Sequence, residues 1–433
     1  MSSGRSGRSG RSLLLVSYFY PPTRDTGAQR PAAMAKWLAR VGWEVTVLTT
    51  GAFGGERAGS SQQAADGGEP VRVLRTRDLQ TLRARMAGHE QVESLFDADS
   101  YSGQPHPLSK VIVPEPLAVA WAPFALAAAL RAHRARPFDC ALTTSPPESA
   151  HAVGRALQRR GVPWVADIRD AWTFEPLRPP FPTAIQRRLD VRLERRLLGA
   201  AHEVVCVSEP AAADLRDRGI AQPRVIANAW DPDADPAPAA LASAEGLLDP
   251  DRVSLLYTGR FGSYGRDPAP LVEALAELGR AEPELARRLE LAVAGPLRPD
   301  ERELLNRDVG PAKVTLLGSL ERDRSLALQR EAEALLLLAQ PTRSQLVNFK
   351  LFEYLAANRP ILALAAGTEA GRIAAAVGVA PVVAANDVPA IVEALAATAR
   401  GDLTPPRPDA AASYSYPAAA EAMSEALEAA MRA

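Results

Sequence analysis

The sequence has few cysteines: Cys140 and Cys206 are the two in a chain of 433 residues. Each lies in a short apolar run, DCALTT or EVVCVSE, that is typical of a buried strand. Two separate, buried thiols argue against a disulfide-rich scaffold and against a cysteine zinc site. They fit a protein of the reducing cytoplasm.

The chain also lacks a long hydrophobic run and an excess of charge of one sign. Its longest apolar run, at 116–130, is shorter than the ~20 residues that a membrane-spanning helix needs, and Pro123 interrupts it. Residues 1–12, MSSGRSGRSGRS, lack the apolar core of a signal peptide, so we expect a disordered tail. The formal net charge is −1, which gives no reason to expect a nucleic-acid partner.

Strand-like apolar runs alternate with helical patterns through the rest of the chain. Several runs are apolar nearly throughout, which is typical of parallel strands covered by helices on both faces. In the first half we expect strands at 12–18, 43–50, 71–75, 139–145, 163–168, 203–208 and 223–228. In the second half we expect them at 253–259, 289–295, 313–318, 334–339, 360–365 and 380–385.

The two halves are separated by a segment rich in proline, aspartate and alanine, at 231–250. The pattern predicts an α/β protein with two doubly wound domains that face each other across a cleft. The predicted boundaries are 13–235 for the first domain, 236–250 for the linker, 251–412 for the second domain and 413–433 for a C-terminal helix. Within the first domain, residues 60–111 are polar and irregular around a single strand.

Polar loops follow the expected strands of the first half. In YPPTRDTGAQRPAAM, Gly27 permits a tight turn and a helix begins near Arg30, so backbone N–H groups there can bind an anion. The loop is not a GxGxxG fingerprint, so a dinucleotide is not implied. In VADIRDAW, Asp167, Arg169 and Asp170 end a buried strand. Three charges at that point are costly unless they are paired or face solvent, and a local Asp–Arg pair is one interpretation.

In the second half, LLYTGRFGSYGRDP places Arg260 directly after a strand and Arg266 in a glycine-rich loop. Two guanidinium groups there can hold a diphosphate through bidentate hydrogen bonds. Two solvated surface arginines are the alternative interpretation.

The segment NFKLFEYLAANRPILAL, 348–364, combines charges with an apolar run. At ~100° per residue, the apolar side chains cover one arc of a helix, and Lys350, Glu353 and Tyr354 share the other. We expect Asn348 to cap this helix and Asn358 to end it, with the charged side turned away from the core. The Lys–Glu pair is either an ordinary helix pair or a carboxylate that binds sugar hydroxyls.

Taken in order, several segments resemble the GT-B-fold retaining glycosyltransferases of family 4. The matching segments are SYFYPPTRDTGAQRPAAMAKWLARVGWEVTVLT, SPPESAHAVG, PWVADIRDAWT, VVCVSEP, RVIANAWDPD, LLYTGRFG, VTLLGSL and FKLFEYLAANRPILAL. They span most of the chain.

The resemblance implies two Rossmann-like domains, with the acceptor bound by the first and a nucleotide-sugar donor by the second. It further implies transfer with retention to a hydroxyl of a polysaccharide, a lipid-linked molecule or a small metabolite. Neither a metal ion nor a cofactor is expected. The C-terminal helix would cross back onto the first domain.

The resemblance also suggests roles for particular residues. Glu353 matches the glutamate that binds the nucleotide ribose, and Gln345 stands where the family often has a second glutamate. Arg260 matches the arginine that binds the diphosphate, Arg266 is the nearest substitute for a missing lysine, and Gly27 matches the glycine-rich loop near the donor phosphates. The other expected donor contacts are Asn348, Phe349, Lys350, Gly259, Leu317 and Gly318. Expected acceptor contacts are His151, Asp167, Arg169 and Trp172, and the expected catalytic residues are Asp170, Arg260 and Arg266.

Two other functions fit the same pattern: a nucleotide-sugar epimerase or hydrolase of this fold, and a relative that binds a sugar nucleotide without turnover. The DAD triplets at 97–99 and 233–235 mimic a metal-binding motif, but both lie in expected loops, so we assign them to chance. The arginines at 187, 188, 192, 195 and 196, together with 116–130, could make a peripheral contact with an anionic membrane. Asp190 and Glu194 interrupt this cluster, which favours a solvated helix face.

Overall fold

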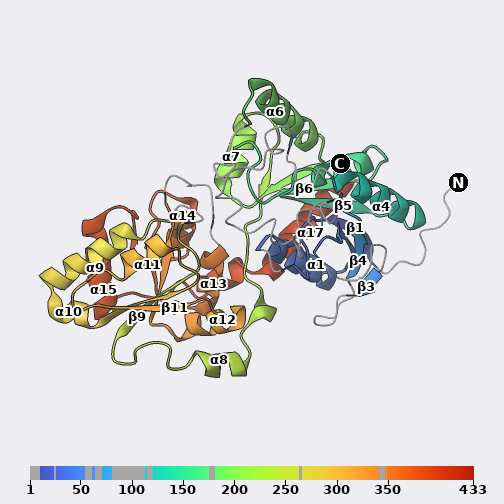
Figure 1. The fold of residues 1–433 in the computed structure, drawn as a ribbon. Coiled ribbons are helices and arrows are strands. Elements are labelled where there is room, and N and C mark those ends of the chain that lie inside the picture. The colour runs from blue at the N-terminus through green and yellow to red at the C-terminus, as the bar shows by residue number, and fades with distance from the viewer. Residues whose placement is uncertain are drawn as a thin grey trace. The chain divides into compact units, whose positions relative to one another are not determined.

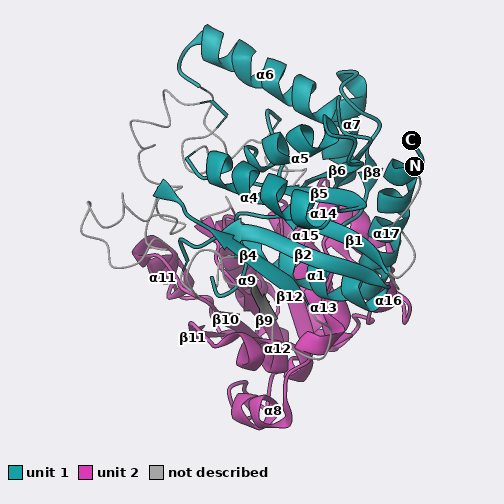
Figure 2. Cartoon of the chain, turned by 90° about the vertical axis from the view of Figure 1, so that its right-hand side faces the viewer, with its two compact units in different colours: residues 1–227, 416–433 teal, residues 228–415 magenta. Residues whose placement is uncertain are grey.

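The computed structural model describes residues 10–23, 26–53, 61–63, 71–79, 113–114, 120–174, 181–262, 266–340, 347 and 349–433. The chain divides into two compact units (Figure 2). Unit 1 consists of Met1–Ala227 and Tyr416–Ala433, and unit 2 consists of Asn228–Ser415. Each unit contains its own sheet with alternating helices and strands, as Figure 1 shows, so the prediction of two α/β domains is confirmed.

The sheet of unit 1 has the order β3-β4-β2-β1-β5-β6-β7-β8 in the part of the unit that the structure describes. All pairs are parallel except β3 with β4. The strands are β1 (Arg11–Val16), β2 (Trp43–Thr50), β3 (Ser61–Gln63), β4 (Arg72–Thr76), β5 (Cys140–Ser145), β6 (Trp164–Ile168), β7 (Glu203–Cys206) and β8 (Arg224–Val225).

The short strand β3 was missed by the sequence analysis, which expected a single strand within 60–111. It pairs antiparallel with β4, from Ser61 opposite Leu74 to Gln63 opposite Arg72. Its sequence, SQQ, has no apolar residue and no alternation, so it carries no strand signal of its own. The rest of 60–111, apart from 71–79, lies outside the described residues.

The helices of unit 1 cover this sheet and enclose one hydrophobic core. They are η1 (Thr26–Ala28), α1 (Gln29–Arg40), α4 (Ala122–Ala135), α5 (Ala150–Gln158), α6 (Ala184–Leu198), α7 (Glu209–Asp217) and α17 (Tyr416–Arg432). The C-terminal helix α17 packs against α1 and against β5, β6 and β7. It therefore completes unit 1, although the whole of unit 2 precedes it in the chain (Figure 2).

The sheet of unit 2 has the order β11-β10-β9-β12-β13-β14, and every pair is parallel. Its strands are β9 (Val253–Thr258), β10 (Leu289–Ala294), β11 (Lys313–Gly318), β12 (Ala334–Leu338), β13 (Ile361–Leu364) and β14 (Val382–Val383). Residues Leu289–Ala294 and Ala334–Leu338 are buried along their whole length, as parallel strands covered on both faces must be.

The helices of unit 2 follow the strands in turn. They are η4 (Pro232–Ala234), α8 (Pro238–Ala244), α9 (Ala269–Ala281), α10 (Pro283–Arg287), α11 (Pro299–Leu305), α12 (Arg322–Glu331), α13 (Phe349–Ala357), α14 (Glu369–Ala376), α15 (Val388–Arg400) and α16 (Ala410–Ser413). Because β9 lies inside the sheet, the loop after it is flanked by the loops after β10 and β12.

The chain changes unit after Ala227 and again after Ser415, not within the linker expected at 236–250. The reason is that α8 belongs to unit 2: it packs against α12, and Arg324 Nε donates to the carbonyl oxygen of Ser243 at 2.8 Å. The proline-rich composition therefore marks the first helical segment of the second unit. Within the described residues, no helix is both long enough and apolar enough to span a membrane.

Candidate functional site

Three glycines bring the backbone of unit 2 into close contact where β9, β10 and β11 end. Gly259 N–H donates to the Ala294 carbonyl, and Gly295 N–H donates to the Gly318 carbonyl, both at 2.8 Å. A Cβ atom on Gly295 would lie 2.0 Å from the carbonyl oxygen of Gly259, which no side chain can tolerate. Gly259 and Gly318 also have positive φ angles, +128° and +69°. The expected donor residues Gly259, Leu317 and Gly318 thus lie together at the ligand-binding edge of a parallel sheet.

The loop after β9 gives the two predicted arginines different positions. Arg260 is exposed, and its backbone carbonyl accepts hydrogen bonds from the Tyr257 hydroxyl at 2.8 Å and from Arg266 Nη1 at 3.0 Å. Further along, Gly262 N–H donates to the buried Glu301 carboxylate at 2.7 Å. Arg266 therefore stabilises the loop through the Arg260 carbonyl, while the guanidinium of Arg260 is exposed to solvent.

Helix α13 carries the predicted donor-binding carboxylate. The helix begins at Phe349, which is half-buried, and Asn358 ends it with a φ angle of +52°, as the sequence predicted. Lys350 Nζ lies 2.8 Å from Glu353 Oε2, and Arg322 Nη1 lies 3.0 Å from Glu353 Oε1. Only 5% of Glu353 is exposed. The carboxylate is therefore held between two cations, one of which comes from the first turn of α12.

The expectation that this side of α13 faces away from the core was wrong. Glu353 and Tyr354 are both buried, because α12 packs against α13 and the end of β9 meets the same side. The hydroxyl of Tyr354 accepts from the Thr258 backbone N–H at 3.0 Å. This bond ties the helix to the residue that precedes Gly259.

The charges around Glu353 keep it ionised. Burial acts to raise the pKa of the Glu353 carboxyl, but Lys350 and Arg322 outweigh it, and the net result is a lowered pKa. Lys350 also lies beside the glycine loop, since a Cβ atom on Gly259 would be 3.9 Å from Lys350 Cε. Arg322 was missed by the sequence analysis because its contact joins two helices and leaves no local signal.

In unit 1, the predicted acceptor residue Asp167 is part of a buried ion pair. Arg30 Nη2 and Nε donate to the two carboxylate oxygens at 2.9 and 3.1 Å, and the Thr144 hydroxyl donates to Asp167 Oδ2 at 2.8 Å. Burial lowers the pKa of Arg30, but the Asp167 carboxylate outweighs that effect and the net pKa is raised. Of the two aspartates that the sequence offered for a local pair with Arg169, Asp167 thus pairs with the distant Arg30.

Arg169 and Asp170 lie just beyond β6. The guanidinium of Arg169 donates to the carbonyls of Ser145 and Pro146, each at 2.8 Å, and to the Gly27 carbonyl. It thereby joins the loops after β5 and β6 to the turn before α1, where the predicted phosphate-side residue Gly27 lies. Asp170 is exposed.

The remaining two acceptor predictions, His151 and Trp172, are buried. His151 Nδ1 lies 2.7 Å from the Thr143 hydroxyl, and its ring stacks on Trp172 with centroids 6.3 Å apart. Burial lowers the pKa of His151 to about 4, so the ring is neutral. Trp172 Nε1 donates to Asp190 at 2.9 Å. Gln345 and Asn348 lie outside the described residues.

Across the described residues, no group of three or more histidine, cysteine, aspartate and glutamate side chains could hold a metal ion. The polar groups that converge on the loop edge of the second sheet include the cations Arg260, Arg322 and Lys350 and the carboxylate of Glu353. Such a set can bind a phosphorylated ligand that also carries hydroxyl groups.

Comparisons with known proteins agree with this arrangement. Residues 26–229, slightly less than half of the chain, match the family model described as a glycosyl transferase 4-like domain. No curated protein sequence matches the chain.

Among solved structures, the fold is similar to a trehalose-phosphate synthase from Burkholderia xenovorans in complex with glucose-6-phosphate, with a TM-score of 0.60, 14% identity and coverage of 96% of this chain and 100% of that one. It is also similar to the sucrose-phosphate synthase of Thermosynechococcus elongatus, with a TM-score of 0.58, 18% identity and coverage of 96% and 98%. A third similar structure is described as trehalose-6-phosphate from E. coli bound with UDP-2-fluoro glucose. Its TM-score is 0.59 and its sequence identity is 13%, with coverage of 96% of this chain and 99% of that one.

The fold predicted from the sequence is thereby confirmed: the solved structures to which the chain is similar are glycosyltransferases of the GT-B fold, and residues 26–229 match a glycosyl transferase 4-like domain. At these identities the solved structures establish the fold, and the family match describes the first half of the chain.

Proposed function

We propose that the protein transfers a sugar, with retention of configuration, from a nucleoside-diphosphate sugar to a hydroxyl group of an acceptor. The observation that carries the proposal is the buried Glu353 carboxylate, held ionised by Lys350 and Arg322 beside the glycine loop of β9. A carboxylate can accept about four hydrogen bonds, so Glu353 can bind hydroxyl groups of the donor while it keeps its two cations.

The cations of the same edge suit the leaving group. When the sugar departs, negative charge develops on the diphosphate, and preorganised donors stabilise it. Arg260 is exposed for direct contact, and Lys350 lies beside Gly259. Arg266 is bound to the Arg260 carbonyl, so we assign it the positioning of this loop. We propose that these side chains, without a bound metal ion, neutralise the diphosphate.

On the acceptor side, Asp170 and Arg169 are the predicted residues that keep contact with solvent. We propose that Asp170 meets the attacking hydroxyl group and that Arg169 fixes the loops around it. Three of the predicted acceptor residues are buried and would stabilise this edge of the sheet without contacting the acceptor: His151, Asp167 and Trp172. A cytoplasmic location fits the two buried free thiols, Cys140 and Cys206.

The test begins with a thermal-shift screen of common nucleotide sugars against the full chain. Glu353→Gln should then remove most of the stabilisation given by the best donor, because the amide cannot accept hydroxyl donors on both sides as the carboxylate does. The matched control is Glu290→Gln. Glu290 is also fully buried and accepts from Asp249 N–H and the Thr315 hydroxyl, but it lies near the amino end of β10, at the opposite edge of the sheet. Equal loss of the donor shift in both variants would overturn the assignment.

Turnover is measured as release of nucleoside diphosphate with and without an acceptor panel that includes glucose-6-phosphate, the ligand of the Burkholderia xenovorans structure. We expect release that depends on the acceptor and is unchanged by EDTA. Release without acceptor would indicate a hydrolase, and donor binding without any release would indicate a binding protein. Either result would overturn the proposed transfer.

A further inference from the structure

Helix α6 in unit 1 buries two acidic residues and exposes apolar ones, although its last turn buries Leu197 and Leu198 in the usual way. Its buried positions include two acidic residues, Asp190 and Glu194, whereas Ile185 and Leu189 are 70% and 48% exposed. All five arginines of the helix are exposed as well. A surface helix normally buries its apolar residues and exposes its charges, so this arrangement calls for an explanation.

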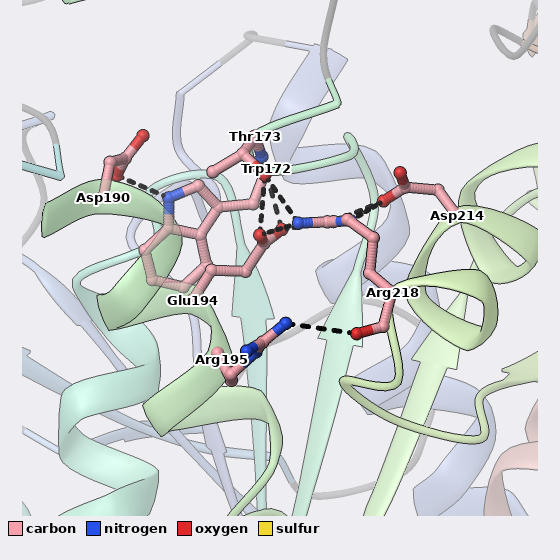
Figure 3. Close-up of polar contacts among 7 residues, drawn as sticks. All are labelled: Trp172, Thr173, Asp190, Glu194, Arg195, Asp214 and Arg218. Atoms are coloured by element: carbon pink, nitrogen blue, oxygen red, sulfur yellow. Dashed lines mark hydrogen bonds and ion pairs between the residues drawn. The ribbon is translucent and has the colours of Figure 1, made fainter. Parts of the chain in front are cut away.

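The two acidic side chains are hydrogen-bonded inside unit 1, and Glu194 is also paired with Arg218, as Figure 3 shows. Glu194 accepts from the Thr173 hydroxyl and from Arg218 Nη1, each at 2.6 Å, and its side chain is 1% exposed. Asp190 accepts from the indole of Trp172 at 2.9 Å. The expectation that these two residues interrupt the arginine cluster was therefore wrong, because neither reaches the outer surface of the helix.

The outer face of α6 is consequently cationic and apolar with no acidic residue. At ~100° per residue, Arg188, Arg192 and Arg196 lie within an arc of about 80°, and Ile185 and Leu189 lie in and beside the same arc. Among the residues that the structure describes, these three guanidinium groups make no hydrogen bond or ion pair. The other two arginines of the helix are engaged, Arg187 with the carbonyls of Phe181 and Pro182, and Arg195 with the carbonyl of Arg218 (Figure 3).

We propose that this outer face, formed by Ile185, Arg188, Leu189, Arg192 and Arg196, docks on the surface of a bilayer that contains anionic phospholipids. Guanidinium groups bind phosphate oxygens in pairs, and a lipid surface offers phosphates at any spacing along the helix. The exposed Ile185 and Leu189 would enter the boundary between head groups and acyl chains, which a nucleic acid could not offer them. The interaction is peripheral, and it does not depend on the proposed sugar transfer.

Sedimentation with vesicles tests the surface on the full chain. We expect binding to phosphatidylcholine vesicles that contain about a third phosphatidylglycerol, none to pure phosphatidylcholine, and weaker binding at high salt. Replacement of Arg188, Arg192 and Arg196 by glutamine should weaken binding about a hundredfold, because each basic residue near an anionic surface contributes about a fivefold factor. The control variant carries Arg131→Gln, Arg134→Gln and Arg159→Gln, which are also exposed arginines of unit 1 and give the same change in net charge.

A second measurement reports whether the helix itself enters the interface. The chain has two cysteines, both buried, and burial raises the pKa of each thiol to about 12, so neither reacts readily with a maleimide. An environment-sensitive fluorophore can therefore be placed at Ile185→Cys, with Arg159→Cys as the control site. We expect anionic vesicles to shift the emission maximum of the fluorophore to the blue when it is attached at position 185, but not at position 159.

The proposal would be overturned by equal binding of the two triple variants, or by equal binding to neutral and anionic vesicles. It would also be overturned if the chain bound heparin or RNA through these arginines but left anionic vesicles unbound, since the face would then serve a soluble polyanion. Urea unfolding of each variant should match that of the unaltered protein, because all replaced side chains are exposed.

Discussion

Arg30 and Asp167 lie 137 positions apart in the sequence, yet their side chains form a bidentate ion pair with exposures of 2% and 4%. The same guanidinium donates to the carbonyls of Ile226 and Ala227 at 3.0 and 2.8 Å. Ala227 is the last residue before the chain enters unit 2. One buried pair thus joins α1, the end of β6 and the point at which the chain leaves unit 1.

Removal of one partner of this pair should be strongly destabilising. Asp167→Ala leaves the Arg30 charge buried and unpaired, so we expect unit 1 to lose about 3–5 kcal/mol of unfolding free energy. Urea unfolding followed by tryptophan fluorescence reports on this unit, because Trp230 is the one tryptophan of six outside it. A loss below about 1 kcal/mol would contradict the prediction.

A double variant separates the buried charge from the loss of contacts. Arg30→Met combined with Asp167→Leu removes both charges and keeps apolar volume, so we expect it to be more stable than Asp167→Ala alone. A double variant that is as unstable as the single one would show that the carbonyl contacts of Arg30, and not its charge, dominate.

The strands were well predicted because a parallel strand covered on both faces must be a short, continuous apolar run. For example, 43–50 was predicted with the same ends that the structure gives, and 289–295 and 334–339 were each predicted one residue too long. The polar strand β3 carries no such signal and was missed, since its place is decided by its neighbour β4. Periodicity therefore identifies strands that build the core and overlooks a strand held at the sheet edge by backbone pairing.

The candidate site was predicted only as far as local sequence determines it. Lys350 and Glu353 are three residues apart on one helix, so their contact could be foreseen. Arg322 reaches the same carboxylate from α12, and Asp167 pairs with Arg30 and not with its neighbour Arg169. Both contacts depend on how helices and strands pack, which the spacing of residues along the chain does not contain.

His151 should make the protein sensitive to acid. Its folded-state pKa is about 4, well below the ordinary value of 6.5, because the ring is buried. Above pH 6.5 the ring is neutral in both states, and as the pH falls from 6.5 towards 4 the unfolded chain takes up a proton that the folded one does not. Stability is therefore lost as the pH falls through this window, by about 2 kcal/mol between pH 7 and pH 5.

The measurement compares unfolding free energies at pH 7 and pH 5 for the protein and for His151→Gln, which cannot titrate. The variant is expected to be less stable than the unaltered protein at pH 7. Between pH 7 and pH 5, however, its unfolding free energy should fall by about 2 kcal/mol less than that of the unaltered protein. His202→Gln is the control, since this half-buried histidine also contacts Trp164, whose backbone N–H donates to His202 Nδ1 at 3.1 Å. Parallel pH profiles for the protein and His151→Gln would rule out His151 as the source of the acid sensitivity.

Gly295 is a position in unit 2 at which the neighbouring backbone leaves no room for a side chain. In Gly295→Ala the new Cβ atom would lie 2.0 Å from the carbonyl oxygen of Gly259, so the ends of β9 and β10 must separate. We expect unit 2 to lose about 3 kcal/mol of stability and the donor-induced thermal shift to disappear, because Gly259 then moves away from Lys350.

Gly401→Ala is the control. Gly401 also has a positive φ, +80°, but a Cβ atom there meets nothing within 4 Å, so only the backbone cost of about 1 kcal/mol applies. Hydrogen exchange read by mass spectrometry over 253–259 and 289–295 locates the change, and equal protection of these segments in the two variants would show that the contact between the glycines does not hold the loop in place.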